Sequence, residues 1–593
     1  MNETERKSML RLLKNLGRKE WLLVLLSVAL ILCQVWLELT MPDYMATITR
    51  LVQTPGSRMS EIWSSGGMML LCAFGSLVAS AATAVCSSRI ATSFGYTLRR
   101  RLFTQVQAFS MGEIGRFSTA SLITRSTNDV TQVQFTIVMG MQSIIRAPIM
   151  AVWAISKIST KQWEWMLSTG AAIALLLVIV LVGILVALPK FKKLQALTDN
   201  VNRITRENLT GLSVVRAYNA EDYQQQKFDN ANDELTRTQL FAQRTMAFLM
   251  PGIQLVMSGL GLAIYWIGAV LINKSAMAER INLFSEMMVF SQYAIMVVMA
   301  FMMLVAIFIM LPRALVAAKR INEVLDVTPS VRDGSKTEGI SGREGEIVFD
   351  RVSFSYPDAE EKVIEDISFT AKKGETLAII GSTGCGKSTV INLIPRFYDA
   401  TDGKVLVDGV DVKEYEQKAL RNKIGYISQR ATLFGGTVTD NIAFGDNGRG
   451  ALGAEEVSSA ADTAQASEFI TTMENGFDSS IAQNGANLSG GQKQRISIAR
   501  AIARKPEILI FDDSFSALDY KTDKALRKAL DRDCADSTRV IVAQRIGTIR
   551  DADQIIVLDE GKIVGKGRHE ELMQSCAVYQ QIALSQLSKE ELA

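Results

Sequence analysis

The chain has 593 residues, which is too long for a single hydrophobic core, and its net charge is only +3, from 64 basic and 61 acidic side chains. Because the charges nearly balance, bulk electrostatics give no reason to expect a nucleic-acid partner. The polar first 20 residues lack a short apolar stretch followed by a cleavage site, so we expect no cleaved signal peptide. Six cysteines show no CxxC pair or metal-ligand spacing, and we expect reduced thiols at Cys33, Cys72, Cys86, Cys385, Cys534 and Cys576.

Long apolar segments dominate the first half of the chain. Each is close to the roughly 20 residues that a helix needs to cross a bilayer. A series of six such segments argues against a soluble domain and predicts a helical membrane domain. The expected spans are approximately Trp21–Thr40, Gly67–Cys86, Phe135–Ile155, Trp165–Leu188, Met246–Ile272 and Met287–Leu311.

Basic residues gather in two long connections, about Ser87–Gln134 and Pro189–Arg244, whereas the short connections after the first, third and fifth spans carry few. By the positive-inside rule, both long connections and both termini are cytoplasmic. Each connection is polar, nearly free of Pro and spaced like a helix. A limb of about 25 helical residues would extend about 38 Å. We therefore expect two helical hairpins whose tips, near Arg116 and Arg216, can contact a cytoplasmic domain.

Two ionisable residues lie within or beside the spans. Glu38 is near the outer end of the first span, and Arg146 is in the third. A charge inside a membrane is costly and marks a cavity or a pathway by default. The alternatives are that Glu38 reaches the interface and that Arg146 forms a structural pair. The sequence leaves the roles of both residues open.

A phosphate-binding loop pattern, GxxxxGK[ST], occurs at residues 381–389, which read GSTGCGKST. An apolar run before it predicts a buried strand, and residues 390–394 after it predict a helix. The glycines allow backbone N–H groups to surround phosphate oxygens at a helix N-terminus. We expect ATP here, with Lys387 at the β- and γ-phosphates and Ser388 on Mg²⁺. The predicted loop residues are Gly381, Ser382, Thr383, Gly384, Cys385, Gly386, Lys387, Ser388 and Thr389.

Residues 488–495, which read LSGGQKQR, resemble the signature motif of the ATP-binding cassette (ABC) superfamily. With it, the whole chain resembles an ABC exporter half-transporter. This resemblance implies an all-α six-helix transmembrane domain of the type I/type IV exporter fold at 1–330, a linker at 331–345, and an α/β P-loop nucleotide-binding domain at 346–593. In the family, two cassettes pair head to tail. The resemblance therefore implies that a second half-transporter is required, whose ATP site is completed by Ser489, Gly490, Gly491 and Gln492.

The remaining family motifs follow in the expected order. Tyr356 resembles the aromatic residue that stacks on adenine, and Gln429 resembles the glutamine that contacts Mg²⁺ and links to the membrane domain. Residues 508–512 resemble the Walker B strand, ending in Asp512. The resemblance thus implies Mg²⁺ ligation by Ser388, Gln429 and Asp512. Three further segments resemble the loop between the two ATP sites (residues 516–519) and the regions at or near coupling helices (residues 127–133 and 207–216).

Two catalytic positions depart from the family pattern. Asp513 stands where a Glu normally orients or deprotonates the attacking water, and its side chain is one methylene shorter. A displacement of about 1 Å can cost on the order of 100-fold in rate. Gln544 stands at the switch position, which usually holds His; an amide can hydrogen-bond phosphate but cannot take a proton. The pair predicts a site that binds ATP well and hydrolyses it slowly.

The leading hypothesis is one half of a heterodimeric exporter in the plasma membrane, similar to the degenerate-site subunit of bacterial multidrug exporters. Its signature motif would complete the partner's competent site. One alternative is a homodimer that hydrolyses ATP slowly, and another is an ATP-gated channel or regulatory membrane protein. The expected partners are membrane lipid and a hydrophobic or amphipathic substrate, without nucleic acid. The fold does not choose among drugs, lipids and peptides.

Overall fold

The computed structural model describes residues 8–586, except 10, 15, 55, 278, 358, 360, 447 and 449. The chain divides into two compact units. The first contains Met1–Thr104 and Ala120–Asp326, and the second contains Gln105–Thr119 and Val327–Ala593. The short segment at the end of the first long hairpin, Gln105–Thr119, therefore belongs with the nucleotide-binding half. Residues 1–7 and 587–593, which fall in the predicted terminal segments, lie outside the described residues.

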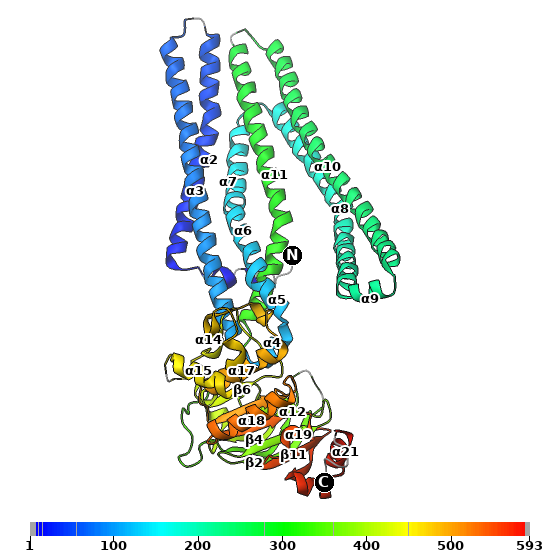
Figure 1. The fold of residues 1–593 in the computed structure, drawn as a ribbon. Coiled ribbons are helices and arrows are strands. Elements are labelled where there is room, and N and C mark those ends of the chain that lie inside the picture. The colour runs from blue at the N-terminus through cyan, green and yellow to red at the C-terminus, as the bar shows by residue number, and fades with distance from the viewer. Residues whose placement is uncertain are drawn as a thin grey trace. The chain divides into compact units, whose positions relative to one another are not determined.

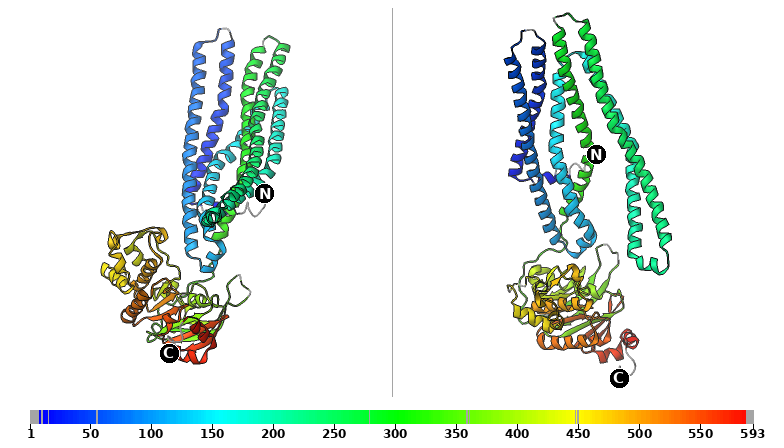
Figure 2. Two further views of the ribbon diagram at one scale, coloured as in Figure 1. Left: turned by 45° about the vertical axis from the view of Figure 1, so that its right-hand side comes forward. Right: turned by 45° about the horizontal axis from the view of Figure 1, so that its top comes forward.

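Six candidate membrane spans are found among the described residues, which confirms the number predicted. The third is interrupted by two π-helical turns. The helices of the spans are α2 (Arg18–Gln53), α3 (Met59–Gln107), the third-span series α5 (Thr119–Thr124), η1 (Arg125–Asp129), α6 (Val130–Gly140), η2 (Met141–Ile145) and α7 (Arg146–Ile158), then α8 (Trp163–Thr210), α10 (Glu221–Lys274) and α11 (Arg280–Leu325). The long helices of this unit run side by side (Figures 1 and 2).

The core of the membrane unit is centred on α11. Its fully buried residues Phe290, Tyr293, Ala294, Val297 and Val298 recur with helical spacing, which places them on one face. This face packs in a single hydrophobic cluster with residues of α2, α7, α8 and α10. The membrane domain is therefore a packed helical bundle, and its apolar stripe is readable from the sequence.

Both long hairpins turn at a short helix. In the second hairpin α9 (Leu212–Ala217) joins α8 to α10, and it contains Arg216 as expected (Figure 1). In the first, α4 (Met111–Phe117) follows α3, because Ser110 and Glu113 form a capping box that starts a new helix. Residues 127–133, expected at or near a coupling helix, lie instead on η1 and α6, beyond the turn. The first tip is α4.

The second unit is an α/β domain, as predicted, built on a six-stranded sheet. All neighbouring strands in it are parallel except the edge pair β12–β11. Its strand order is β12 (Lys562–Gly567), β11 (Gln554–Asp559), β3 (Thr376–Gly381), β10 (Thr538–Val542), β9 (Ile508–Asp512) and β6 (Ile424–Ile427). An antiparallel sheet adds β2 (Ile364–Ala371), β1 (Ile347–Phe354), β4 (Asp402–Val407) and β5 (Val410–Asp411), and a small ribbon pairs β7 (Gly436–Thr437) with β8 (Ser480–Ile481).

Strand register decides where the candidate site lies. Val542 at the end of β10 pairs with Asp512 at the end of β9 and with Ile379 on β3. The carboxyl ends of these parallel strands therefore share one edge, where ligands bind in open α/β sheets. Three of these strands end at candidate site residues: β3 at Gly381, β9 at Asp512, which Asp513 follows, and β10 two residues before Gln544.

Helices cover the sheet in two hydrophobic clusters. Ile380 packs in the cluster that includes α17, whereas its neighbour Ile379 packs in the cluster that includes α12, because alternate strand residues point to opposite faces. The helices are α12 (Lys387–Leu393), α13 (Gln417–Asn422), α14 (Val438–Ile442), α15 (Ala454–Thr463), α16 (Ser467–Ile470), α17 (Gly490–Ala503), α18 (Tyr520–Asp533), α19 (Ile546–Ile549), α20 (His569–Ser575) and α21 (Ala577–Gln586), with 3₁₀ turns η3 (Val412–Glu414), η4 (Gly476–Asp478) and η5 (Gln483–Gly485).

Candidate nucleotide-binding site

The loop at 381–389 connects β3 to α12, so the expected strand and helix flank it. Gly386 has a positive φ of 98°, which glycine adopts without the strain that a side chain would cause. At Gly381 a Cβ atom would lie 2.1 Å from the carbonyl oxygen of Leu558, so no side chain fits. These glycines fold the backbone tightly into the N-terminus of α12, where N–H groups and the helix dipole favour an anion.

The Lys387 side chain folds back over the phosphate loop. Its Nζ donates hydrogen bonds to the carbonyl oxygens of Gly381 (2.8 Å) and Ser382 (2.6 Å). Cys385 is buried beneath the loop, its sulfur 3.7 Å from Nζ. The exposed residues of the loop are Ser382, Thr383, Gly384 and Ser388. The loop therefore presents backbone groups, a hydroxyl and one ammonium, which are the groups that bind a polyphosphate.

The residues expected to hold Mg²⁺ are partly assembled. Ser388 Oγ donates to Asp512 Oδ1 at 3.0 Å, whereas Gln429 Nε2 reaches Asp513 Oδ2 at 3.3 Å. Burial raises the pKa of Asp512, and so does the neighbouring charge of Asp513, while the Ser388 hydrogen bond and Lys387 lower it. Among the described residues, no group of three or more His, Cys, Asp or Glu side chains is arranged so that it could hold a metal ion. A hydroxyl with one carboxylate fits Mg²⁺, which usually takes its other oxygens from phosphates and water.

The two positions that depart from the family pattern contact each other. Asp513 Oδ2 accepts hydrogen bonds from Gln544 Nε2 (2.8 Å) and from Gln429 (3.3 Å). The Asp513 backbone has a φ of 48°, which is unusual for a residue with a side chain. It is held by its N–H to Val542 and by the Ser516 hydroxyl on its carbonyl. Burial raises the pKa of the Asp513 carboxyl, which two amides hold in place.

Tyr356, the expected adenine-stacking residue, belongs to an aromatic group with Phe354 and Tyr398. Its ring meets theirs edge to face at 5.0 and 5.4 Å, and its hydroxyl is hydrogen-bonded to Thr389 Oγ1 at 3.1 Å. The structure thus joins Tyr356 to the phosphate loop. Gly112 of α4 lies near this group, because a Cβ added there would be 3.9 Å from Tyr398.

The signature residues begin α17. Ser489 caps this helix: its hydroxyl accepts the N–H of Gln492, and its own N–H donates to Gln492 Oε1 at 2.9 Å. A Cβ on Gly490 would meet nothing within 4 Å. Among the described residues, no hydrogen bond or ion pair joins 489–492 to the phosphate loop of the same chain. This open helix start is available to a ligand bound by another chain.

Comparison with known proteins agrees with this geometry. The ABC transporter transmembrane region matches residues 22–301, and the ABC transporter ATP-binding region matches residues 364–516. An uncharacterized ABC transporter ATP-binding protein of Mycobacterium tuberculosis is 39% identical over 526 residues, which cover 88% of this chain and 87% of the relative. The chain belongs to the ABC transporters. It is of the exporter type, with membrane and ATP-binding domains in one polypeptide.

Further relatives support the assignment of this chain to the ABC transporters. An uncharacterized ATP-binding protein of Bacillus subtilis is 36% identical, with 89% of this chain and 90% of the relative covered. An ATP-dependent lipid A-core flippase of Pseudomonas aeruginosa is 32% identical, with 82% and 79% covered. The solved structure of a bacterial Atm1-family ABC exporter with ATP bound has a TM-score of 0.74 at 22% identity and covers 96% of this chain and 98% of that one, which shows the shared fold.

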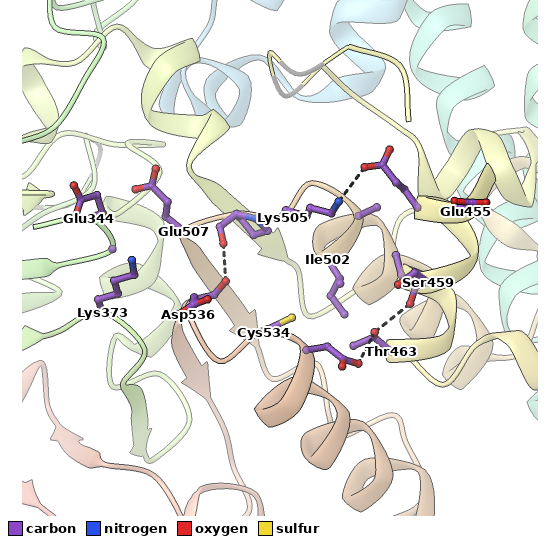
Figure 3. Close-up of a pocket in the computed structure, with 17 residues that line it drawn as sticks. Glu344, Lys373, Glu455, Ser459, Thr463, Ile502, Lys505, Glu507, Cys534 and Asp536 are labelled. Carbon is purple, nitrogen blue, oxygen red and sulfur yellow. Dashed lines mark hydrogen bonds and ion pairs between the residues drawn. The ribbon is translucent and has the colours of Figure 1, made fainter. Parts of the chain in front are cut away.

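A cavity of about 510 Å³ in the nucleotide-binding unit of this transporter is not the nucleotide site (Figure 3). Acidic side chains, including Glu344, Glu455 and Asp536, line it, and none of the predicted ATP residues does. An ion pair between Lys505 and Glu456 at 3.0 Å lies in its wall.

In the membrane unit of the transporter, Glu38 and Arg146 bind each other. Arg146 Nη2 lies 2.8 and 2.7 Å from the two carboxylate oxygens of Glu38, which also accept hydrogen bonds from Gln34 and Ser76. The carboxylate is therefore held among α2, α3 and α7. This geometry agrees with the pairing alternative for Arg146.

Two contacts of the site were not predicted. Gln586, at the end of α21, donates from Nε2 to the carbonyl oxygen of Gln544 at 2.7 Å. Glu113 on α4 accepts a hydrogen bond from the Ser330 N–H at 3.1 Å, which ties the hairpin tip to the segment that follows α11. No motif marks either residue. The Ser110–Glu113 capping-box spacing was a readable sign of a helix start, but it gives no sign of the contact with Ser330. All six cysteines are free, as predicted.

Proposed function

We propose that this exporter uses ATP to move hydrophobic or amphipathic compounds, namely drugs, lipids or peptides, across the plasma membrane as one half of a heterodimer. The observation that supports the asymmetric arrangement is the Asp513 carboxylate, which is short by one methylene and already bonded to the amides of Gln544 and Gln429. A carboxylate so held is poorly placed to orient water, and an amide at 544 cannot take up a proton. The second site of the assembly would carry out most of the turnover.

In its own site the chain would bind ATP through the loop at 381–389, with Lys387 at the β- and γ-phosphates and Tyr356 at the adenine. Ser388, Asp512 and Gln429 would hold Mg²⁺, which supplies positive charge to phosphate oxygens when bound. The Ser388–Asp512 contact of 3.0 Å supports this pairing. Binding needs only the complete loop, so it survives the changes at 513 and 544.

In the partner's site the chain would contribute Ser489, Gly490, Gly491 and Gln492. The intact cap and open start of α17 support this role, since preorganised donors aimed at a γ-phosphate are among the strongest contributions to catalysis. The proposed organisation is a membrane domain at 1–330, a linker at 331–345 and a nucleotide-binding domain at 346–593. Both termini would be cytoplasmic, because the basic residues of both hairpins favour that side.

The substrate class follows from the relatives and the membrane unit together. The Pseudomonas aeruginosa protein named above is called an ATP-dependent lipid A-core flippase, and similarity to it supports an amphipathic, lipid-like substrate. A homodimer with two slow sites, or an ATP-gated channel, is the competing outcome. The intact signature favours turnover at some site in the assembly.

The test begins with purification of a tagged chain from its native membrane. We expect a second, different ABC chain in equal amount, and ATP-dependent movement of a fluorescent phospholipid or cationic dye after reconstitution of the pair in proteoliposomes. Lys387→Ala should weaken ATP binding at this chain's own site, because it removes the charge that faces the phosphates. Recovery of this chain alone, active as a homodimer, would contradict the heterodimer, and ion conductance without transport would favour the channel.

A further inference from the structure

The C-terminal helix α21 contacts the switch loop, defined here as residues 543–546 between β10 and α19. Gln586, the last residue of α21, uses both ends of its amide: Nε2 donates to the Gln544 carbonyl oxygen at 2.7 Å, and Oε1 accepts the Ile546 N–H at 2.9 Å. The two contacts flank Arg545. A single side chain therefore fixes the backbone of the switch loop on both sides of one residue.

The position of Gln586 is determined by the core of the domain. Tyr579 and Ala583 of the same helix are fully buried, and the Tyr579 hydroxyl is hydrogen-bonded to His569 Nδ1 at 2.7 Å. Ala583 and Gln586 are three residues apart and so share one helix face. This face packs near the short helix α19 and strands β3 and β11 of the main sheet. The amide is thus carried by an anchored helix.

The start of the switch loop is held by the Ala543 N–H, which donates to the Ile379 carbonyl oxygen at 3.2 Å, whereas its end relies on Gln586. Ile546 is the first residue of the four-residue helix α19, and N–H groups of a first helical turn have no partner within the helix. The N-cap residue Arg545 makes no side-chain capping hydrogen bond. Gln586 Oε1 supplies the missing acceptor from outside. Gln544, in turn, donates from its side chain to Asp513 Oδ2 at 2.8 Å.

We propose that Gln586 is a positioning residue of the nucleotide site, through which α21 sets the place of Gln544 relative to Asp513. It touches neither the phosphate loop nor Asp513, so it acts through the loop backbone. The inference rests on the proposed function, because it assumes that this chain's own site turns over ATP slowly. A shift of about 1 Å in the switch side chain can change a rate on the order of 100-fold.

The test compares Gln586→Ala with Gln580→Ala in the full complex. Gln580 is a matched control, because it lies on the same helix and donates to the Met573 carbonyl of α20 at 2.6 Å, away from the switch loop. Hydrolysis is measured at this chain's site after the partner's catalytic carboxylate has been removed. We expect Gln586→Ala to lower kcat about tenfold with KM for ATP within about twofold, and Gln580→Ala to change kcat less than about twofold.

A double-mutant cycle separates positioning from general stability. With Gln544→Ala already present, Gln586→Ala should cause less than about a further twofold loss, because the side chain that it positions is gone. Gln586→Glu keeps an acceptor for Ile546 but opposes a carboxylate oxygen to the Gln544 carbonyl, so we expect a loss as large as that of alanine. Equal losses from Gln586→Ala in the two backgrounds would overturn the proposal.

Hydrogen exchange gives a readout that does not depend on activity. In Gln586→Ala the peptide containing Ile546 should exchange faster, while residues 577–583 stay protected. If 577–583 lose protection equally, the side chain merely holds α21 together and the positioning role is refuted. If the unmodified complex hydrolyses no ATP at all, the proposed function fails, yet the exchange of Ile546 still decides whether Gln586 holds the switch loop.

Discussion

The two parts of this nucleotide-binding domain that we propose to face a γ-phosphate are the signature and the catalytic edge, meaning Asp513 and Gln544, and they differ in how their geometry is fixed. The signature is local: Ser489 and Gln492 cap their own helix, and nothing crowds Gly490. The catalytic edge is assembled from distant segments, since Asp513 depends on Gln429, Gln544 and Ser516, and the switch loop depends on Gln586. A short motif can specify the first part alone, whereas the second part is sensitive to changes in several elements.

The largest effect is expected from a substitution in the signature that leaves Asp513 and Gln544 unchanged. Gly490→Asp places a negative charge at the start of α17 against the partner's ATP, and we expect steady-state ATPase of the complex to fall at least about 100-fold. Asp513→Asn should lower it less than about twofold, because in the proposed heterodimer the partner's site carries the turnover. Gly490→Ala is the matched control. Its Cβ meets nothing within 4 Å in this chain, so its loss should be far smaller than that of the charged variant.

The outcome separates the assemblies. In a homodimer every site contains Asp513, so both Asp513→Asn and Gly490→Asp would be severe. Equal and large losses in reconstituted complex would therefore overturn the heterodimer.

A second experiment restores the residue types that are usual in the family at positions 513 and 544. Asp513→Glu combined with Gln544→His returns the carboxylate length and the titratable group that the family uses, and we expect hydrolysis at this chain's own site to rise about tenfold or more. Single-turnover hydrolysis with the partner's site disabled measures this rise. Asp513→Glu alone should gain less, because Gln544 still holds the carboxylate oxygen at 2.8 Å. No gain from the double change would mean that geometry outside these two residues keeps the site slow.

The same contrast explains how far the sequence could be read. The phosphate loop, the signature and Asp512 were predictable because each motif lies within one strand, loop or helix whose period and glycines are local. The six spans were predictable from apolar length alone. The Asp513–Gln544 bond and the Gln586 contact were not, because they join residues 31 and 42 positions apart through strand register and helix docking. The first hairpin tip, predicted near Arg116, lies on α4, whereas residues 127–133, which the resemblance put at or near a coupling helix, lie on η1 and α6.

A third prediction concerns Glu113 on α4, at the tip of the first hairpin. Glu113 on α4 binds the Ser330 N–H, and Gly112 beside it approaches Tyr398. Glu113→Ala should raise the ATP hydrolysed per substrate transported about threefold, because the tip loses a charge-assisted hydrogen bond to the nucleotide-binding unit. Arg116→Ala is the control, since Arg116 is exposed and lies over Phe117 of its own helix. A similar change in both variants would argue against Glu113 as the specific contact.

The smallest effect is expected from a change of pH, which tests whether the switch loop depends on α21. Burial lowers the pKa of His569 below its usual 6.5, and the charge of Arg550 acts in the same direction. The unfolded imidazole therefore takes up a proton at a higher pH than the folded one. The stability that the buried neutral ring contributes is complete above pH 6.5 and is lost as pH falls toward the folded-state pKa. After correction for the intrinsic pH dependence of amide exchange, the protection of α21 and of the switch loop should fall by a few-fold from pH 7.5 to about 5.5. His569→Gln, which keeps a polar partner for Tyr579 but does not titrate, should remove most of this dependence, while the protection of α17 stays level in both proteins. An unchanged slope in His569→Gln would assign the pH response to another group.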